Sequence, residues 1–160
     1  MTFVTLEQLF KYVIDMSQSL LQSKNYEDFF QVVTPLRFSC MTPSGFPSII
    51  SLWYLYKDGK IYCATQKNAK VISYIKENNK CAFEITIGHF PYKGVRGHGK
   101  VKLREDIAIE VLDSLIEKFI GNRDSFLSRY LIKRKENEVA LEITPLRLFP
   151  WDYSKRMNNK

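Results

Sequence analysis

Hydrophobic and polar positions along the chain follow two different periods, which separate predicted strands from predicted helices. Strands are expected where β-branched and aromatic residues gather, because such side chains suit a pleated, partly buried surface. The predicted strands are Leu36–Met41, Ser48–Tyr56, Ile61–Ala64, a run through Phe83 to Ile87, Val95–Leu103 and Val139–Leu148. Between the second and the third, Lys57–Lys60 is expected to form a tight turn, because Gly59 can take a positive φ without steric cost.

Helices are expected where apolar residues recur every three or four positions. The predicted helices lie within residues 1–24, at about Tyr26–Val32, at Val71–Glu77, at Ile107–Phe119 and at about Asp124–Ile132. Thr5 and Gln8 match a capping box at the start of the first helix, and Asp106 is expected to cap the fourth. Strands that cluster, with helices between only some of them, predict an α+β fold and not a repeating βαβ sheet.

Composition adds little beyond a folded domain with a preference for anions. The chain has 160 residues, 45% of them hydrophobic, and a formal net charge of +7. That charge favours an anionic partner, and a phosphate-bearing cofactor, a nucleic acid or an anionic membrane would satisfy it equally well. Cys40, Cys63 and Cys81 lack metal-finger spacing, so buried free thiols in a reducing cytoplasm are expected and no metal site is predicted. No signal-peptide pattern or membrane span is recognised, and the protein is predicted to be cytoplasmic.

The polar loop before the third helix is the first candidate for ligand chemistry. Thr65-Gln66-Lys67-Asn68-Ala69-Lys70 brings a hydroxyl, two lysines and backbone N–H groups to the start of the helical run Val71–Glu77. A helix start with free N–H groups and nearby cations suits a bound phosphate. The loop therefore predicts a phosphate site, against the plainer possibility that Lys70 is a solvated surface lysine.

At these residues the chain resembles the FMN-binding split-barrel family related to pyridoxamine 5′-phosphate oxidase. Three blocks match in order: Gly45-Phe46-Pro47 through Trp53 with Thr65 and Asn68-Ala69-Lys70; Tyr92 to Val101; and Ile143 to Arg147 followed by Trp151-Asp152. The resemblance covers about residues 25–157 and leaves 1–24 as an N-terminal helical extension. It implies a six-stranded antiparallel split β-barrel with flanking helices, forming a homodimer with the cofactor at the interface.

The resemblance also implies a set of cofactor-binding residues. The strand along the flavin ring would contribute Ser48, Ile50, Ser51, Leu52 and Trp53; Ala64 and Thr65 would flank the ribityl chain and phosphate; Asn68, Ala69 and Lys70 would hold the phosphate; Gly94 and Trp151 would lie near the ring, Trp151 from the second subunit. For Trp53 and Trp151 the plainer alternative is an ordinary core or interface aromatic.

Two departures from the family pattern bear on function. Ala69 stands where the family often has Arg, so one phosphate contact is missing unless Lys67 or Arg96 replaces it. Gly94 stands where the oxidases carry Gln at the flavin ring, which argues against vitamin B6 oxidation, and no such activity is expected.

The implied function is that of an FMN-binding oxidoreductase that transfers hydride or electrons to an unidentified small molecule. An 8-hydroxy-5-deazaflavin coenzyme is the alternative cofactor, and a flavin-binding electron carrier without turnover is the alternative role. No catalytic acid or base is predicted, because the cofactor supplies the chemistry. A basic nucleic-acid module is the less favoured third class, suggested by alternating cations at Lys93, Arg96, His98, Lys100, Lys102 and Arg104.

Overall fold

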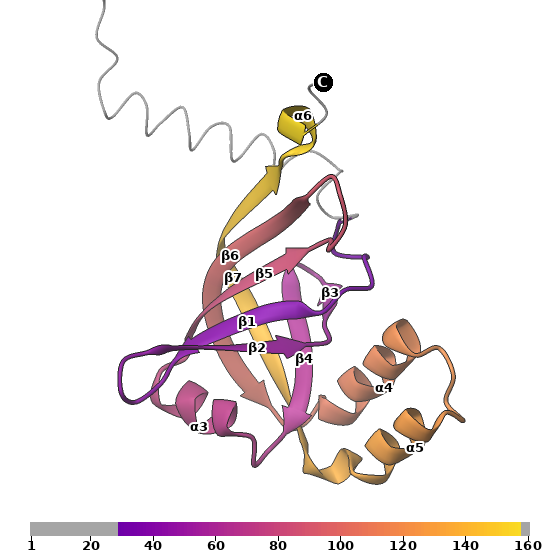
Figure 1. Cartoon of the computed structure of the whole chain (residues 1–160). Helices are drawn as coiled ribbons and strands as arrows, with labels where there is room; N and C mark the ends of the chain where they lie inside the picture. Colours follow the sequence, from indigo (N-terminus) through magenta and orange to yellow (C-terminus); the bar gives the residue numbers. More distant parts are fainter. Residues whose placement is uncertain (1–28, 158–160) are drawn as a thin grey trace, which may run out of the picture.

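A computed structural model describes residues 29–157, which form one strongly curved antiparallel sheet with most of its helices around the lower end and a short C-terminal helix at the upper end (Figure 1). The strands are β1 (Leu36–Met41), β2 (Pro47–Leu52), β3 (Leu55–Lys57), β4 (Lys60–Gln66), β5 (Lys80–Thr86), β6 (Lys93–Arg104) and β7 (Glu138–Asp152). The helices are α3 (Lys70–Glu77), α4 (Ala108–Phe119), α5 (Phe126–Lys133), the 3-10 turn Lys135–Asn137 and α6 (Ser154–Met157). The α+β class is thus confirmed, with a strand order of β2-β1-β5-β6-β7-β4-β3.

The described part of the chain has seven strands, so the prediction of six is wrong. The single strand expected over Ser48–Tyr56 is two strands with different partners. β2 pairs with β1, placing Leu52 opposite Leu36, whereas β3 pairs with β4, placing Leu55 opposite Tyr62. The chain turns at Trp53 and Tyr54, between the two strands. The apolar run therefore contributes one strand to each edge of the sheet.

β6 and β7 are the long strands on which the barrel is built. They pair along most of their length, with one register shift between His98 and Gly99, and β7 also pairs with β4. β2 and β3 lie at the two edges of the sheet, and β2 packs against β4 without pairing to it. The sheet therefore curls nearly closed and stays open along one seam, which is the arrangement of a split barrel.

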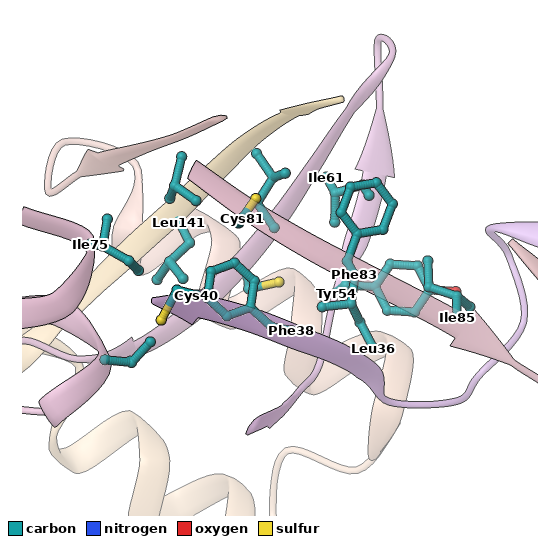
Figure 2. Close-up of a cluster of buried hydrophobic side chains, with 14 of the residues drawn as sticks. Leu36, Phe38, Cys40, Tyr54, Ile61, Ile75, Cys81, Phe83, Ile85 and Leu141 are labelled. Atoms are coloured by element: carbon teal, nitrogen blue, oxygen red, sulfur yellow. The ribbon is translucent and has the colours of Figure 1, made fainter. Parts of the chain in front are cut away.

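The interior of the barrel is apolar and includes all three cysteines (Figure 2). Cys40 of β1 lies opposite Cys81 of β5 in the strand register, and Cys63 is fully buried on β4. Burial raises the pKa of Cys81 to about 12, against the weaker lowering effect of a backbone hydrogen bond from Gly99. The three thiols are therefore protonated and buried, as predicted, and they form no disulfide.

The predicted helices between strands are confirmed, with one error at a helix start. α3 packs against β1, and α4 packs against β4 and β7. Asp106 does not cap α4: the N-cap position is Ile107, and Asp106 instead accepts two hydrogen bonds from the Arg104 guanidinium, at 2.6 and 2.8 Å. A carboxylate close to a cation in the preceding strand thus takes the stronger charge-assisted partner.

The tight turn predicted at Lys57–Lys60 is also confirmed, with φ values of 53° at Asp58 and 75° at Gly59.

Residues 1–24, predicted as a helical extension, lie outside the described residues, as do residues 26–28 of the helix expected at 26–32; in the described part of that segment residue 29 is helical and the chain then turns. Among residues 29–157, no helix combines the length and the apolar character needed to cross a membrane.

Candidate functional site

The ends of β2 and β4 form a cavity with the helices α4 and α5, and these two helices lie at the lower right in Figure 1. The cavity has a volume of about 400 Å³, within the usual range of small-molecule sites. Its strand side is made by Ser51, Leu52, Trp53 and Ala64–Gln66; its helical side by Leu112, Leu115, Leu127, Tyr130 and Leu131; and its remaining edge by Arg134 and Glu138. The site is thus mainly apolar, with polar groups concentrated at one edge.

The cavity brings together five of the twelve residues predicted to bind a cofactor: Ser51, Leu52, Trp53, Ala64 and Thr65. The Trp53 ring stacks on Phe119 of α4 with centroids 5.1 Å apart, so its orientation is fixed by packing. The hydroxyl of Ser51 accepts a 2.7 Å hydrogen bond from Arg37 on β1. The half-buried indole of Trp53, with the polar Ser51 at the same strand end, is suited to a flat heteroaromatic ligand.

Two other predicted residues of β2, Ser48 and Ile50, lie outside the cavity, although they share a strand face with Leu52, which lines it. Ile50 packs against the main core, and neither Ser48 nor Ile50 lines the cavity. Only the end of the strand reaches the cavity.

The loop before α3 lies next to the cavity edge and not inside it. Asn68 and Lys70 are exposed, and Ala69 is partly buried against the main core. The start of α3 has no side-chain cap, and Lys70 makes no ion pair within residues 29–157. The loop is tied to the cavity edge by two backbone bonds, Ala69 N–H to Gln66 O at 2.9 Å and Lys67 N–H to Asn137 O at 2.7 Å.

Neither residue expected to replace the missing cation at position 69 is well placed. The ammonium group of Lys67 pairs with Glu105 at 2.9 Å. Arg96 lies on the outer face of β6, with its guanidinium carbon 5.5 Å from the centre of the Trp151 ring.

The remaining predicted residues, Gly94 and Trp151, face each other across β6 and β7 and do not line the cavity. A Cβ added to Gly94 would lie 2.6 Å from the carbonyl oxygen of Ile85 and 2.8 Å from the indole of Trp151. The ring nitrogen Nε1 of Trp151 is buried and has no hydrogen-bond partner in the described part of the chain. Gly94 thus makes room for the indole, which keeps one unused donor.

Four polar residues of the cavity edge escaped the sequence prediction: Gln66, Tyr130, Arg134 and Glu138. The Gln66 side-chain amide donates to the Glu138 carboxylate and accepts from the Arg134 guanidinium at 3.3 Å, and Arg134 also donates to the Tyr130 hydroxyl. Burial raises the pKa of Glu138, although the Gln66 hydrogen bond and the charge of Arg134 act in the opposite direction. Arg134 belongs to the basic run Lys133-Arg134-Lys135, and such a run is also typical of a solvated surface segment. The sequence therefore carries no specific signal for Arg134 as a site residue.

No protein-family model matches the chain, and no curated protein matches it either. Solved structures do resemble it. A conserved hypothetical protein of Mycobacterium tuberculosis is 19% identical, with a TM-score of 0.74, over 87% of this chain and 89% of that one. An F420 reductase is 15% identical, with a TM-score of 0.66, over 77% and 94% of the two chains. A candidate pyridoxamine 5′-phosphate oxidase from Listeria innocua is 15% identical, with a TM-score of 0.62, over 81% and 97%.

These likenesses define the class of fold. The chain has the split-barrel fold found in structures named for pyridoxamine 5′-phosphate oxidase and for F420 reductase, and the resemblance seen in the sequence is confirmed at this level.

Proposed function

We propose that the protein binds FMN in the cavity between the ends of β2 and β4 and the helices α4 and α5. The observation that carries the proposal is the convergence of Ser51–Trp53 with Ala64 and Thr65 around one cavity. Residues that the family resemblance assigns to a flavin, from two segments at least eleven positions apart in sequence, are thereby brought to a single mainly apolar site. The likeness in fold to structures named for F420 reductase and for pyridoxamine 5′-phosphate oxidase supports the same interpretation.

The residues present fit such a cofactor. Trp53, with the leucines of α4 and α5, offers apolar surface to the ring system. The end of β2 offers backbone groups to the polar edge of the ring, and the Thr65 hydroxyl would lie beside the ribityl chain. Lys70 and the uncapped start of α3 would hold the phosphate, because free N–H groups and a cation both favour an anion. When bound, the flavin supplies hydride or electron transfer, and the chain contributes binding, orientation and exclusion of water.

The proposed reaction is reduction of a small molecule. A deazaflavin coenzyme would use the same surfaces, and the structural likeness to an F420 reductase keeps it as the alternative cofactor. An electron carrier would bind the flavin equally well without turnover. Oxidation of a reduced nicotinamide coupled to an added acceptor distinguishes the enzyme from the carrier.

We further propose that two copies associate through the outer face of the sheet. Ile49 of β2 is 71% exposed, and with Phe149 of β7 it lines a shallow groove that also contains Arg37 and Arg96. Exposed apolar side chains gathered on one sheet face mark an interaction surface. In such a homodimer Gly94 and Trp151 of one copy would lie near the cavity of the other, as the family resemblance implies.

Equilibrium titration of FMN, followed by flavin fluorescence, tests the proposal. The wild type should bind FMN, and Lys70→Ala should weaken binding by about 1.5–3 kcal/mol, the contribution of a charge-assisted hydrogen bond. Lys76→Ala removes an exposed cation from the other end of α3 and is the matched control. Ala64→Leu, which fills the cavity, should abolish binding. Failure of the wild type to bind either FMN or the deazaflavin would refute the proposal.

A further inference from the structure

The polar edge of the cavity contains a guanidinium that no carboxylate neutralises directly. Arg134, just beyond the end of α5, is exposed and makes no ion pair within residues 29–157. Its two hydrogen-bond partners in the described part of the chain are neutral acceptors, the Tyr130 hydroxyl and the Gln66 amide oxygen. A guanidinium has more N–H donors than two acceptors can use. Arg134 therefore retains both its charge and free donors at the mouth of an apolar cavity.

The Arg134 side chain is held in place by its neighbours. Its guanidinium carbon lies 5.2 Å from the centre of the Tyr130 ring, and Tyr130 precedes it by one helical turn. Gln66 stands between Arg134 and the buried Glu138, donating to the carboxylate and accepting from the guanidinium. The amide thus separates the two charges, and the carboxylate is directed toward Gln66.

Arg134 is also close to the start of α3. Gln66, which accepts from Arg134, receives the Ala69 N–H at 2.9 Å through its backbone oxygen. The Lys67 N–H donates to Asn137 O at 2.7 Å, so the loop is bonded to the segment that directly follows Arg134. Two independent contacts thus bring the helix end that carries Arg134 to the loop that carries Lys70.

We infer that Arg134 is a second cation for the phosphate of the flavin-type cofactor, paired with Lys70 and compensating for the alanine at position 69. This inference rests on the proposed function and adds to it the residue that replaces the missing contact. Arg suits the role because its planar fork can bind two phosphate oxygens at once. Lys67, the other nearby cation, is already paired with Glu105.

The affinities of FMN and riboflavin, which differ only in the phosphate, test this inference in the full chain. Wild type should bind FMN more tightly than riboflavin. Arg134→Gln should raise the Kd for FMN about tenfold or more and leave the Kd for riboflavin unchanged, whereas Lys133→Gln, which removes the neighbouring exposed cation, should change neither. Arg134→Lys should give an intermediate preference, which serves as the test if the glutamine variant fails to fold.

Three outcomes would overturn the inference and leave flavin binding in place: equal wild-type affinity for the two flavins, an unchanged FMN affinity in Arg134→Gln, or an equal loss of both affinities. The last would mean that Arg134 only shapes the cavity through Tyr130 and Gln66. If the wild type binds neither flavin, the inference and the proposed function both fail.

Discussion

Gly94 shows how a residue chosen for a ligand role can be required by packing. The space that its side chain would occupy is taken by the Ile85 carbonyl and the Trp151 indole. We expect Gly94→Ala to lower the free energy of unfolding by about 1–3 kcal/mol, the usual cost of overpacking a filled interior. Urea denaturation measures the change. Gly88→Ala is the control, because a Cβ there meets nothing within 4 Å; an equal effect at both glycines would contradict this account.

Glu138 makes stability depend on pH in a direction opposite to that of an ordinary paired carboxylate. Because burial raises its pKa in the folded state, the charged form destabilises the fold at neutral pH, and the penalty disappears once the group is protonated in both states, below the unfolded pKa of about 4.3. Glu138→Gln should therefore raise the melting temperature at pH 7 by a few degrees and change it little near pH 4. Thermal melts of wild type and variant at both pH values measure this.

The control for that experiment is Glu136→Gln, which removes an exposed carboxylate two positions earlier. The Gln66 amide can still donate to the new side-chain carbonyl of Glu138→Gln, so the hydrogen bond is kept. Equal stabilisation at pH 7 and pH 4 would show that the charge of Glu138 is not responsible.

At the scale of elements, α5 depends on a small hydroxyl network at its start. The Ser125 hydroxyl accepts from the Ser128 N–H at 3.1 Å and donates to the Ser128 hydroxyl, which in turn donates to Asn122 O. Ser125→Ala should cost about 1 kcal/mol, the usual value of an N-cap. We expect several-fold faster hydrogen exchange at the α5 amides, and no such change in Ser114→Ala, whose hydroxyl bonds back to Glu110 on the exposed face of α4. Unchanged exchange in α5 would refute the capping role.

The elements also show where sequence patterns succeed and where they fail. β1 matches its predicted bounds, and α3 begins one residue earlier than predicted, because each has one buried face and a clear end signal. The break at Trp53 and Tyr54 was missed because both residues are as apolar as the strands around them. The turn there depends on the pairing of β2 with β1 and of β3 with β4. Tyr54 is fully buried, and its hydroxyl donates a hydrogen bond to Val32 O, which is distant in sequence.

Part of the cavity lining was also predicted from the sequence. Ser51–Trp53, Ala64 and Thr65 line the cavity, and the family resemblance had assigned all of them to a cofactor. Tyr130 and Arg134 could not be assigned, since their place at the cavity depends on where α5 lies, and Glu138 could not be assigned because its place depends on the pairing of β7 with β4. Periodicity identifies a helix but does not specify which neighbour it approaches.

At the scale of the whole molecule, the proposed homodimer has a specific test. Ile49→Lys places a charge in the groove beside Phe149 and should shift the species measured by size-exclusion chromatography with light scattering from dimer to monomer. Phe126→Lys is the matched control, because Phe126 is 80% exposed on α5, away from that groove. A monomeric wild type, or a dimer that survives Ile49→Lys, would contradict the proposed interface.

The central claim is that the cavity between β2, β4 and the α4–α5 pair is the flavin site. Amide chemical-shift mapping during titration with FMN tests it most directly, because the method reports the place of binding as well as its occurrence. The account predicts the largest shifts at Ser51–Trp53, Ala64–Gln66 and the α5 residues Tyr130 and Leu131. Shifts confined to the outer face around Ile49 and Phe149, or no shifts at saturating FMN, would contradict it.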